Sequence, residues 1–129
     1  SIPLGALMGW LLLSLTSQGH WDAALILPAY YLTDSGLTML KRLLTGGKPW
    51  EAHSEHAYQQ YVRSGHSHPA TVRWVIACDV VILVLALFTV VRPDLNLLAI
   101  LGAYGVSLAL YLMFISAPVK RELQELKAV

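Results

Sequence analysis

Long apolar stretches alternate with short polar segments along this chain, a pattern typical of membrane-spanning helices. A helix needs roughly 20 apolar residues to cross the hydrocarbon core of a bilayer, and Val72–Val91 and Leu95–Ala117 supply them. Ile2–Thr16 is a shorter apolar stretch. Trp21–Leu44 is longer, but Pro28 and the polar run 33–36 interrupt it, so we expect a bent or broken span. The pattern predicts an all-α fold, a polytopic membrane helix bundle with about four transmembrane helices.

A further, short helix is predicted in the polar segment between the second and third spans. Gly46-Gly47 would end the preceding helix, Pro49 suits a helix start, and Ser64-Gly65 would end the new helix. These signals give an amphipathic helix over Trp50–Arg63. It would lie in a loop, residues 45–70, that connects the spans.

Periodicity assigns two faces to this loop helix. Trp50, Ala57 and Tyr61 would form its apolar stripe. His56 and Arg63 would share the polar face two turns apart, about 10 Å along the helix axis. A face of that kind can hold a diphosphate, because imidazole donates hydrogen bonds to phosphate oxygens and guanidinium forms a charge-assisted fork.

Composition supports the membrane assignment for all 129 residues, which we treat as a single membrane domain. Hydrophobic residues make up 56% of the chain, charged residues 13%, and the mean hydropathy is +0.56. The lone Cys78 excludes a disulfide within the chain and offers no set of thiolate metal ligands. We expect no nucleic-acid partner, and homodimer formation is left open.

Basic residues orient the predicted bundle, because cytoplasmic loops collect Lys and Arg. Five lie in or beside the central loop and three in the tail, whereas Arg92 alone occupies the turn between the last two spans. We therefore expect a multi-pass protein with central loop and tail both cytoplasmic. Charges at helical spacing over 119–129 also predict a surface-lying helix in the tail.

The central loop holds the main candidate residues. Four of the five histidines lie between His53 and His68. The alternative is that they are ordinary residues at the depth of the lipid headgroups. His53 and His56 could bind zinc, but their spacing is looser than that of an HExxH motif and no further ligand is evident. We expect His66 and His68, which flank a helix start before Pro69, to cap that helix or to face solvent.

Two acidic residues within the predicted spans are also candidates. An ionisable side chain inside a membrane span is by default a functional hypothesis, and Asp34 is the stronger case. Its alternatives are pairing with Arg42 or capping the broken helix. For Asp79 we expect pairing within the bundle. Tyr104 and Tyr111, seven residues apart on the last span, are expected to pack.

Three segments in order carry a resemblance to a known family. They are the opening Ser1-Ile-Pro-Leu-Gly5, the span end Asp34-Ser-Gly-Leu-Thr-Met-Leu-Lys41-Arg42, and the loop Ala52-His53-Ser-Glu-His56-Ala-Tyr58-Gln59. Together they resemble the C-terminal part of the bacterial polyprenyl-phosphate N-acetylhexosamine-1-phosphate transferases, glycosyltransferase family 4. The similarity covers essentially the whole chain, and the loop motif is its most specific part.

The resemblance assigns roles to individual residues. His56 matches, by its spacing to Arg63-Ser-Gly65, the cytoplasmic histidine that helps to bind the nucleotide-sugar diphosphate in that family. His53 fits the His-x-x-His variant. Arg63, Arg42 and Asp34 are the further substrate-binding candidates. The sequence departs from the three-histidine cluster of better-known members by having Glu55 and Ala57 beside His56, which leaves the sugar open.

The implied activity is transfer of a sugar-1-phosphate from a UDP-sugar to a polyprenyl phosphate such as undecaprenyl phosphate. This step initiates lipopolysaccharide or cell-wall glycan synthesis at the bacterial inner membrane. The family holds Mg²⁺ through acidic residues in a paired-aspartate motif and a Gly-Asp-x-Gly-Ser segment, whose last residue Ser1 resembles. We therefore expect a fragment of a longer enzyme, with no catalytic or metal-binding residue of its own and inactive alone.

Two other classes remain open from the sequence. The chain could be a non-catalytic membrane subunit whose loop docks a partner. It could also be a histidine-based membrane metalloenzyme, which would retain stoichiometric zinc or iron, whereas a transferase would exchange Mg²⁺ readily.

Overall fold

A computed structural model describes residues 2–48, 50–51, 56–117 and 126–128 of the chain, and within these ranges the fold is helical. Its elements in chain order are α1 (Ile2–Ser17), α2 (Trp21–Ile26), α3 (Ala29–Leu44), α4 (Ala57–Arg63), α5 (His68–Val91), the 3₁₀ turn η1 (Pro93–Leu95) and α6 (Asn96–Ser116). The all-helical prediction is thereby confirmed. The tail helix predicted over 119–129 lies mostly outside the described residues.

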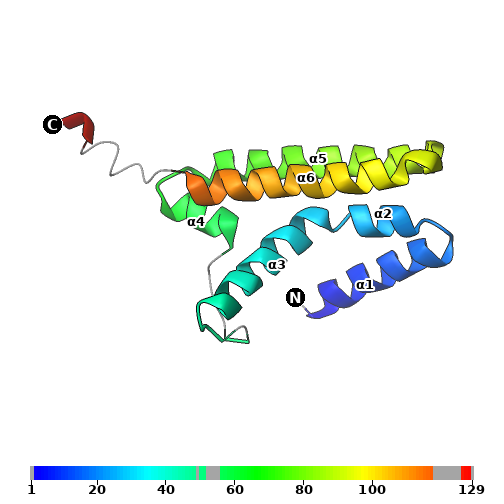
Figure 1. The fold of residues 1–129 in the computed structure, drawn as a ribbon, viewed down its shortest axis with the longest axis horizontal. Coiled ribbons are helices and arrows are strands. Elements are labelled where there is room, and N and C mark those ends of the chain that lie inside the picture. The colour runs from blue at the N-terminus through cyan, green and yellow to red at the C-terminus, as the bar shows by residue number, and fades with distance from the viewer. Residues whose placement is uncertain (1, 49, 52–55, 118–125, 129) are drawn as a thin grey trace.

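Helices α5 and α6 form a long antiparallel hairpin, seen in Figure 1 as the two ribbons that lie side by side above the other helices. The side chains that these two helices bury are small or apolar and recur at helical spacing: Cys78, Ile82 and Ala86 on α5, and Ala99, Ala103, Ser107, Leu110 and Phe114 on α6. Small residues let helices approach closely in a membrane. The buried hydroxyls of Thr89 and Ser107 donate to carbonyls of their own helices.

Within the part of the chain that the structure describes, two segments are long and apolar enough to cross a membrane, His68–Val91 and Pro93–Ser116, each of 24 residues. Only 22% and 33% of their most apolar windows are buried inside the protein. A core helix of a soluble protein would be mostly covered, so these exposed apolar surfaces support a membrane location. Helix α1, with 16 residues, and the pair α2 and α3 fall short of that length individually. The predicted count of four spans is not confirmed.

The second predicted span is broken, as expected, at Pro28. Helix α2 ends at Ile26 and α3 begins at Ala29, because proline has no N–H to continue the helical hydrogen bonds. A neighbouring helix satisfies a carbonyl at the break: the Tyr104 hydroxyl of α6 donates to Leu25 O at 3.0 Å. The polar run 33–36 does not break the helix, since α3 continues through it.

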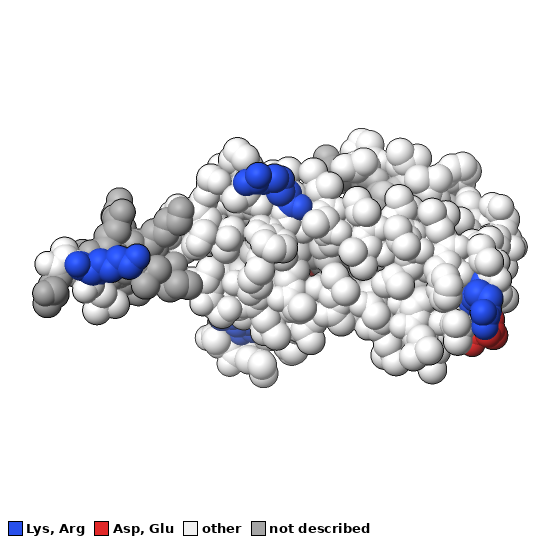
Figure 2. All heavy atoms as spheres, turned by 90° about the horizontal axis from the view of Figure 1, so that it is seen from above, with Lys and Arg blue, Asp and Glu red and all other residues white. Residues whose placement is uncertain are grey.

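The other helices are arranged around the hairpin as Figure 1 shows. Helix α2 packs on α5 and α6, α1 folds back on α2, and α3 starts against α6 and then slants away from it. Helix α4 lies against α6 at the end of the hairpin where the tail leaves. Viewed over the hairpin, the surface is mostly free of Lys, Arg, Asp and Glu, and charged side chains gather toward the ends (Figure 2).

Two predictions for side chains within the spans have different outcomes. Tyr111 is buried and packs in the core, as expected. Asp79 was expected to pair within the bundle, but it is exposed on α5, and no described residue forms an ion pair with it. The physical reason is its position: Cys78 and Ile82 define the buried face of α5, and Asp79 lies beside that face.

Candidate functional site

The candidate site is centred on a buried carboxylate that joins α3 to the start of α4. Asp34 lies on α3 with its side chain only 6% exposed. Its Oδ2 is 3.0 Å from Nδ1 of His56, and its Oδ1 accepts a hydrogen bond from the backbone N–H of Ala57 at 2.8 Å. One carboxylate thus orients an imidazole and caps a helix that follows it by more than twenty residues.

This arrangement fixes how the imidazole of His56 can act. A histidine whose Nδ1 faces a carboxylate is held in one ring orientation, and its chemistry with a ligand goes through Nε2. The side chain of His56 is 27% exposed, so a ligand can reach it. Tyr58 stacks beside it, with ring centroids 5.9 Å apart and planes inclined by 15°. The result is a positioned imidazole at the end of the hairpin.

The loop helix is shorter than predicted. Helix α4 begins at Ala57 rather than Trp50, because His56 has extended backbone angles, φ −58° and ψ 146°, and acts as the N-cap residue. Trp50 lies outside the helix and is 80% exposed, so it forms no apolar stripe with Ala57 and Tyr61. His56 and Arg63 therefore do not share a helical face; they lie before and at the end of α4.

Aromatic packing holds α4 on the hairpin. The Tyr61 ring stacks on His66 at a centroid distance of 3.9 Å and packs against Phe114 of α6 at 4.7 Å. His66 Nδ1 also lies 2.9 Å from Ser64 Oγ and 3.2 Å from Tyr61 O. The expectation that His66 caps a helix or faces solvent is wrong, because Ser67 caps α5 and the His66 ring stacks on Tyr61. His68 is exposed, as expected.

Arg42 forms hydrogen bonds within the turn that ends α3. Its Nη2 donates to Lys48 O at 3.0 Å, and Gly47 N–H donates to Arg42 O at 2.8 Å. The predicted alternatives for Asp34, pairing with Arg42 or capping the broken helix, are therefore both wrong. Two turns of helix, about 12 Å of rise, separate Asp34 from Arg42 along α3.

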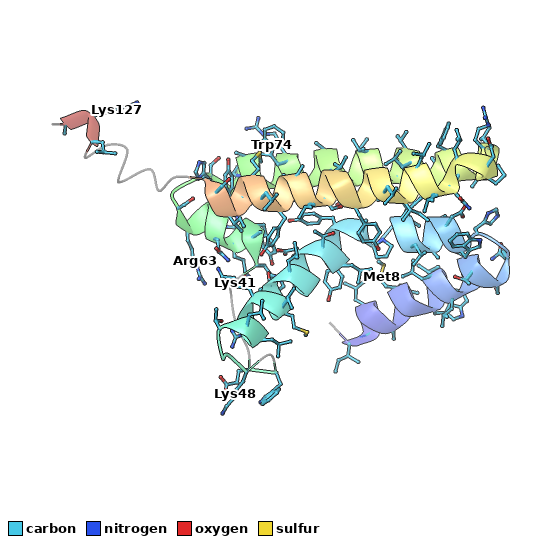
Figure 3. All side chains as sticks on the ribbon, in the orientation of Figure 1. Met8, Lys41, Lys48, Arg63, Trp74 and Lys127 are labelled. Atoms are coloured by element: carbon cyan, nitrogen blue, oxygen red, sulfur yellow. The ribbon has the colours of Figure 1, made fainter. Side chains whose placement is uncertain are left out.

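The remaining predicted site residues are distributed around this centre. Figure 3 shows Arg63 and Lys41 at the end of the molecule where α4 lies, with Lys48 beyond them on the turn after α3. Arg63 is exposed in the last turn of α4. His53 lies outside the described residues. The structure thus brings Asp34 and His56 together and leaves both arginines outside that contact.

Sequence reasoning missed several polar groups near this centre. The hydroxyls of Tyr30, Ser35 and Thr38 on α3 and the Gln59 side-chain carbonyl on α4 are buried, and the described residues offer them no hydrogen-bond partner. Tyr30, Asp34 and Thr38 recur every four residues and so share one face of α3. That spacing is the signal in the sequence that could have found them.

The described residues do not form a magnesium site by themselves. No three His, Cys, Asp or Glu side chains among them come close enough to hold a metal ion. Mg²⁺ prefers oxygen ligands, and both oxygens of the buried Asp34 carboxylate already face protein groups. The Mg²⁺ that the family resemblance implies would therefore need ligands from elsewhere.

Comparison with known proteins identifies no relative, since no family model, no curated protein and no solved structure matches the chain.

Proposed function

We propose that this chain forms part of an enzyme that transfers an N-acetylhexosamine 1-phosphate from a UDP-sugar to a polyprenyl phosphate at the bacterial inner membrane. The observation that supports this most is the Asp34–His56 pair. It places an oriented, partly exposed imidazole at the end of an apolar hairpin, where a water-soluble donor and a lipid acceptor can meet.

In this reaction an oxygen of the lipid phosphate attacks the β-phosphorus of the UDP-sugar. The bond from the β-phosphorus to the bridging oxygen breaks, UMP leaves with that oxygen, and the product is a sugar-diphospholipid. Mg²⁺ bound elsewhere in the enzyme would supply charge neutralisation. In its imidazolium form, with Nδ1–H facing Asp34, His56 contributes a hydrogen bond from Nε2–H to a diphosphate oxygen, and this bond strengthens as negative charge moves toward the leaving UMP.

Asp34 acts through His56 rather than on the substrate. Its carboxylate holds Nδ1 at 3.0 Å and so keeps Nε2 directed toward a ligand. Arg63, exposed at the far end of α4, is the supporting cation for the nucleotide. Arg42 shapes the turn after α3 through Lys48 O and supports the site indirectly. With the tail and the central loop on the cytoplasmic side, the nucleotide would arrive from the cytoplasm.

The test is UMP release by full-length protein in which His56 is replaced by Ala. Loss of a hydrogen bond to a charged group predicts about a 10- to 100-fold fall in kcat/KM. His20→Ala is the matched control, because His20 lies in the turn between α1 and α2, away from α4. It should leave UMP release unchanged.

The other two classes give different results in the same preparation. A non-catalytic subunit would keep the activity of its complex in the His56→Ala variant. A histidine metalloenzyme would be purified with stoichiometric zinc or iron, and its removal rather than Mg²⁺ depletion would abolish activity. Either result would overturn the proposed transferase function.

A further inference from the structure

One carboxyl group lies on the exposed side of α5, halfway along the helix. Asp79 is the twelfth of the 24 residues of α5, and its side chain is exposed. Among the residues that the structure describes, none forms an ion pair or a hydrogen bond with it. Arg73, the nearest cation along α5, lies six residues closer to the helix start, about 9 Å along the axis. The described part of the chain therefore leaves Asp79 without a partner.

In a bilayer this position is unfavourable for a carboxyl group that faces lipid. With α5 as a span, Asp79 would lie near the middle of the hydrocarbon core, about 15 Å from either headgroup layer. The aspartate side chain is too short to reach the headgroups, whereas the long side chain of Arg73 can extend toward them. Ionisable side chains within spans almost always face protein or a water-filled cavity. We therefore expect a further protein surface to cover Asp79.

The residues around Asp79 form an exposed stripe along α5, which we call the Asp79 seam. They follow one another at intervals of four, three, four and seven residues: Val72, Ile76, Asp79, Leu83 and Val90. The apolar members are each about half exposed. These intervals are those of a heptad repeat, which keeps one face of a helix against a parallel partner. The seam extends over 18 residues, about 27 Å along the axis.

The helices of the same chain leave this seam open. Helix α5 packs on its neighbours through the side that holds Cys78 and Ile82, and the seam lies next to that side. At the beginning of the seam, Val72 and Ile76 line a surface pocket of about 280 Å³ beside α3 and α4, so these two helices do not cover it. A second helix can therefore lie along the seam.

A second copy of this chain is the partner that the seam fits. Two copies insert into a membrane in the same orientation, so equivalent residues lie at equal depth and a two-fold axis brings the two Asp79 carboxyls together. A protonated carboxyl both donates and accepts, so two of them satisfy each other. In coiled coils, one polar side chain within an apolar seam also fixes the register and the number of helices. A different protein would have to supply a donor at the same depth.

We propose that two copies of this chain pair in the membrane through the Asp79 seam, with the two Asp79 carboxyls hydrogen-bonded to each other at the two-fold axis. The apolar members of the seam pack against the same residues of the other copy on either side of this contact. The inference takes α5 as a membrane span and does not depend on the proposed transferase activity.

The first test measures association in a bilayer. Two batches of full-length protein, labelled with a donor and an acceptor dye, are mixed in vesicles of phosphatidylethanolamine and phosphatidylglycerol. Energy transfer is then followed as the protein is diluted with lipid. The variants are Asp79→Leu and Asp79→Asn. Asp94→Leu is the control, because Asp94 is also an exposed carboxylate but lies in the turn η1, outside the seam.

The Asp79→Leu variant should dimerise about tenfold more weakly than the wild type, the effect expected from the stronger hydrogen bonds between membrane helices. Asp79→Asn should stay within about threefold of the wild type, because an amide also donates and accepts. Asp94→Leu should associate as the wild type does.

The second test locates the contact by disulfide crosslinking in the same vesicles. Leu83→Cys and Val81→Cys are each made in a Cys78→Ala background, which removes the native thiol. Leu83 and Val81 are 49% and 41% exposed and lie at nearly equal depth, but they are about 160° apart around the helix. Only Leu83→Cys, on the seam, should form a crosslinked dimer.

Three results would overturn the proposal. A wild-type protein that is monomeric at every protein-to-lipid ratio would show that something other than a second copy covers Asp79. Equal association of the wild type and Asp79→Leu would show that the carboxyls do not meet. Crosslinking through Val81→Cys rather than Leu83→Cys would place the contact on the opposite side of α5.

Discussion

In the α5–α6 hairpin the two helices meet through small apolar side chains, whereas α3 and α4 are joined through one buried carboxylate. The hairpin distributes its packing over many residues, from Cys78 on α5 to Phe114 on α6. At the corner formed by α3 and α4, the Asp34 side chain makes the contacts to both His56 and Ala57. The hairpin should therefore tolerate single changes, and the corner should not.

The difference matters for function. Packing that is spread over many residues holds the hairpin helices rigidly, whereas a contact made by one side chain changes its geometry whenever that side chain moves. The hairpin provides a fixed frame. The corner presents the imidazole whose position decides the proposed chemistry. Changes at Asp34 and His56 should thus affect stability and activity together, whereas changes within the hairpin should affect stability alone.

The largest effect is expected for His56→Ala. This change leaves the Asp34 carboxylate buried without the imidazole, and breaking a buried pair by removing one partner costs about 3 kcal/mol. The free energy of unfolding in detergent measures it. The double variant Asp34→Asn/His56→Ala should recover a large part of the loss, because no uncompensated charge remains.

That double variant also separates folding from chemistry. If it folds nearly as stably as the wild type but still shows the 10- to 100-fold fall in UMP release expected for His56→Ala, His56 acts in the reaction and not only in the fold. Strictly additive losses in the double-mutant cycle would contradict a direct pairing of the two side chains.

A second, smaller effect distinguishes the two contacts of Asp34. Asp34→Ala removes the acceptor of the Ala57 N–H and should cost about 2 kcal/mol, the price of leaving a buried donor unsatisfied. Asp34→Asn retains an acceptor oxygen and should cost about 1 kcal/mol. Equal losses in the two variants would show that capping of α4 contributes nothing to the stability of the corner.

The hairpin could be predicted from the sequence almost to its ends. Val72–Val91 was expected and α5 is His68–Val91, one turn longer because Ser67 caps it and Pro69 suits its first turn. Leu95–Ala117 was expected and α6 is Asn96–Ser116. Apolar length alone decides such helices, so the local pattern contains the information that is needed.

The corner could not be predicted in the same way. The start of α4 depends on Asp34, which lies 23 residues before Ala57 in the chain. Helical periodicity over Trp50–Arg63 suggests a polar face shared by His56 and Arg63. In the structure α4 instead begins at Ala57, directly after His56, because Asp34 caps it there. The candidates Asp34 and His56 were both recognised, and what the pattern lacked was the contact between them.

A third prediction concerns the turn that follows α4. Gly65 has φ +97°, a conformation that side chains with a Cβ rarely adopt. Gly65→Ala should lower the free energy of unfolding by about 1 kcal/mol. Gly105→Ala is the control from the hairpin: nothing lies within 4 Å of the added Cβ, so the higher helix propensity of alanine should raise the free energy of unfolding by about 0.5 to 1 kcal/mol. Equal effects would contradict the contrast between the two regions.

The smallest effect tests the one polar contact described between the hairpin and the broken span. Tyr104→Phe removes the donor to Leu25 O, next to the break at Pro28. Hydrogen bonds between membrane helices contribute about 0.6 kcal/mol on average, so the loss of unfolding free energy should be of that size. UMP release should be unchanged, because the Tyr104 hydroxyl bonds to α2 and not to Asp34 or His56. A large loss of activity would instead show that the position of α3, set at this break, controls how Asp34 holds His56.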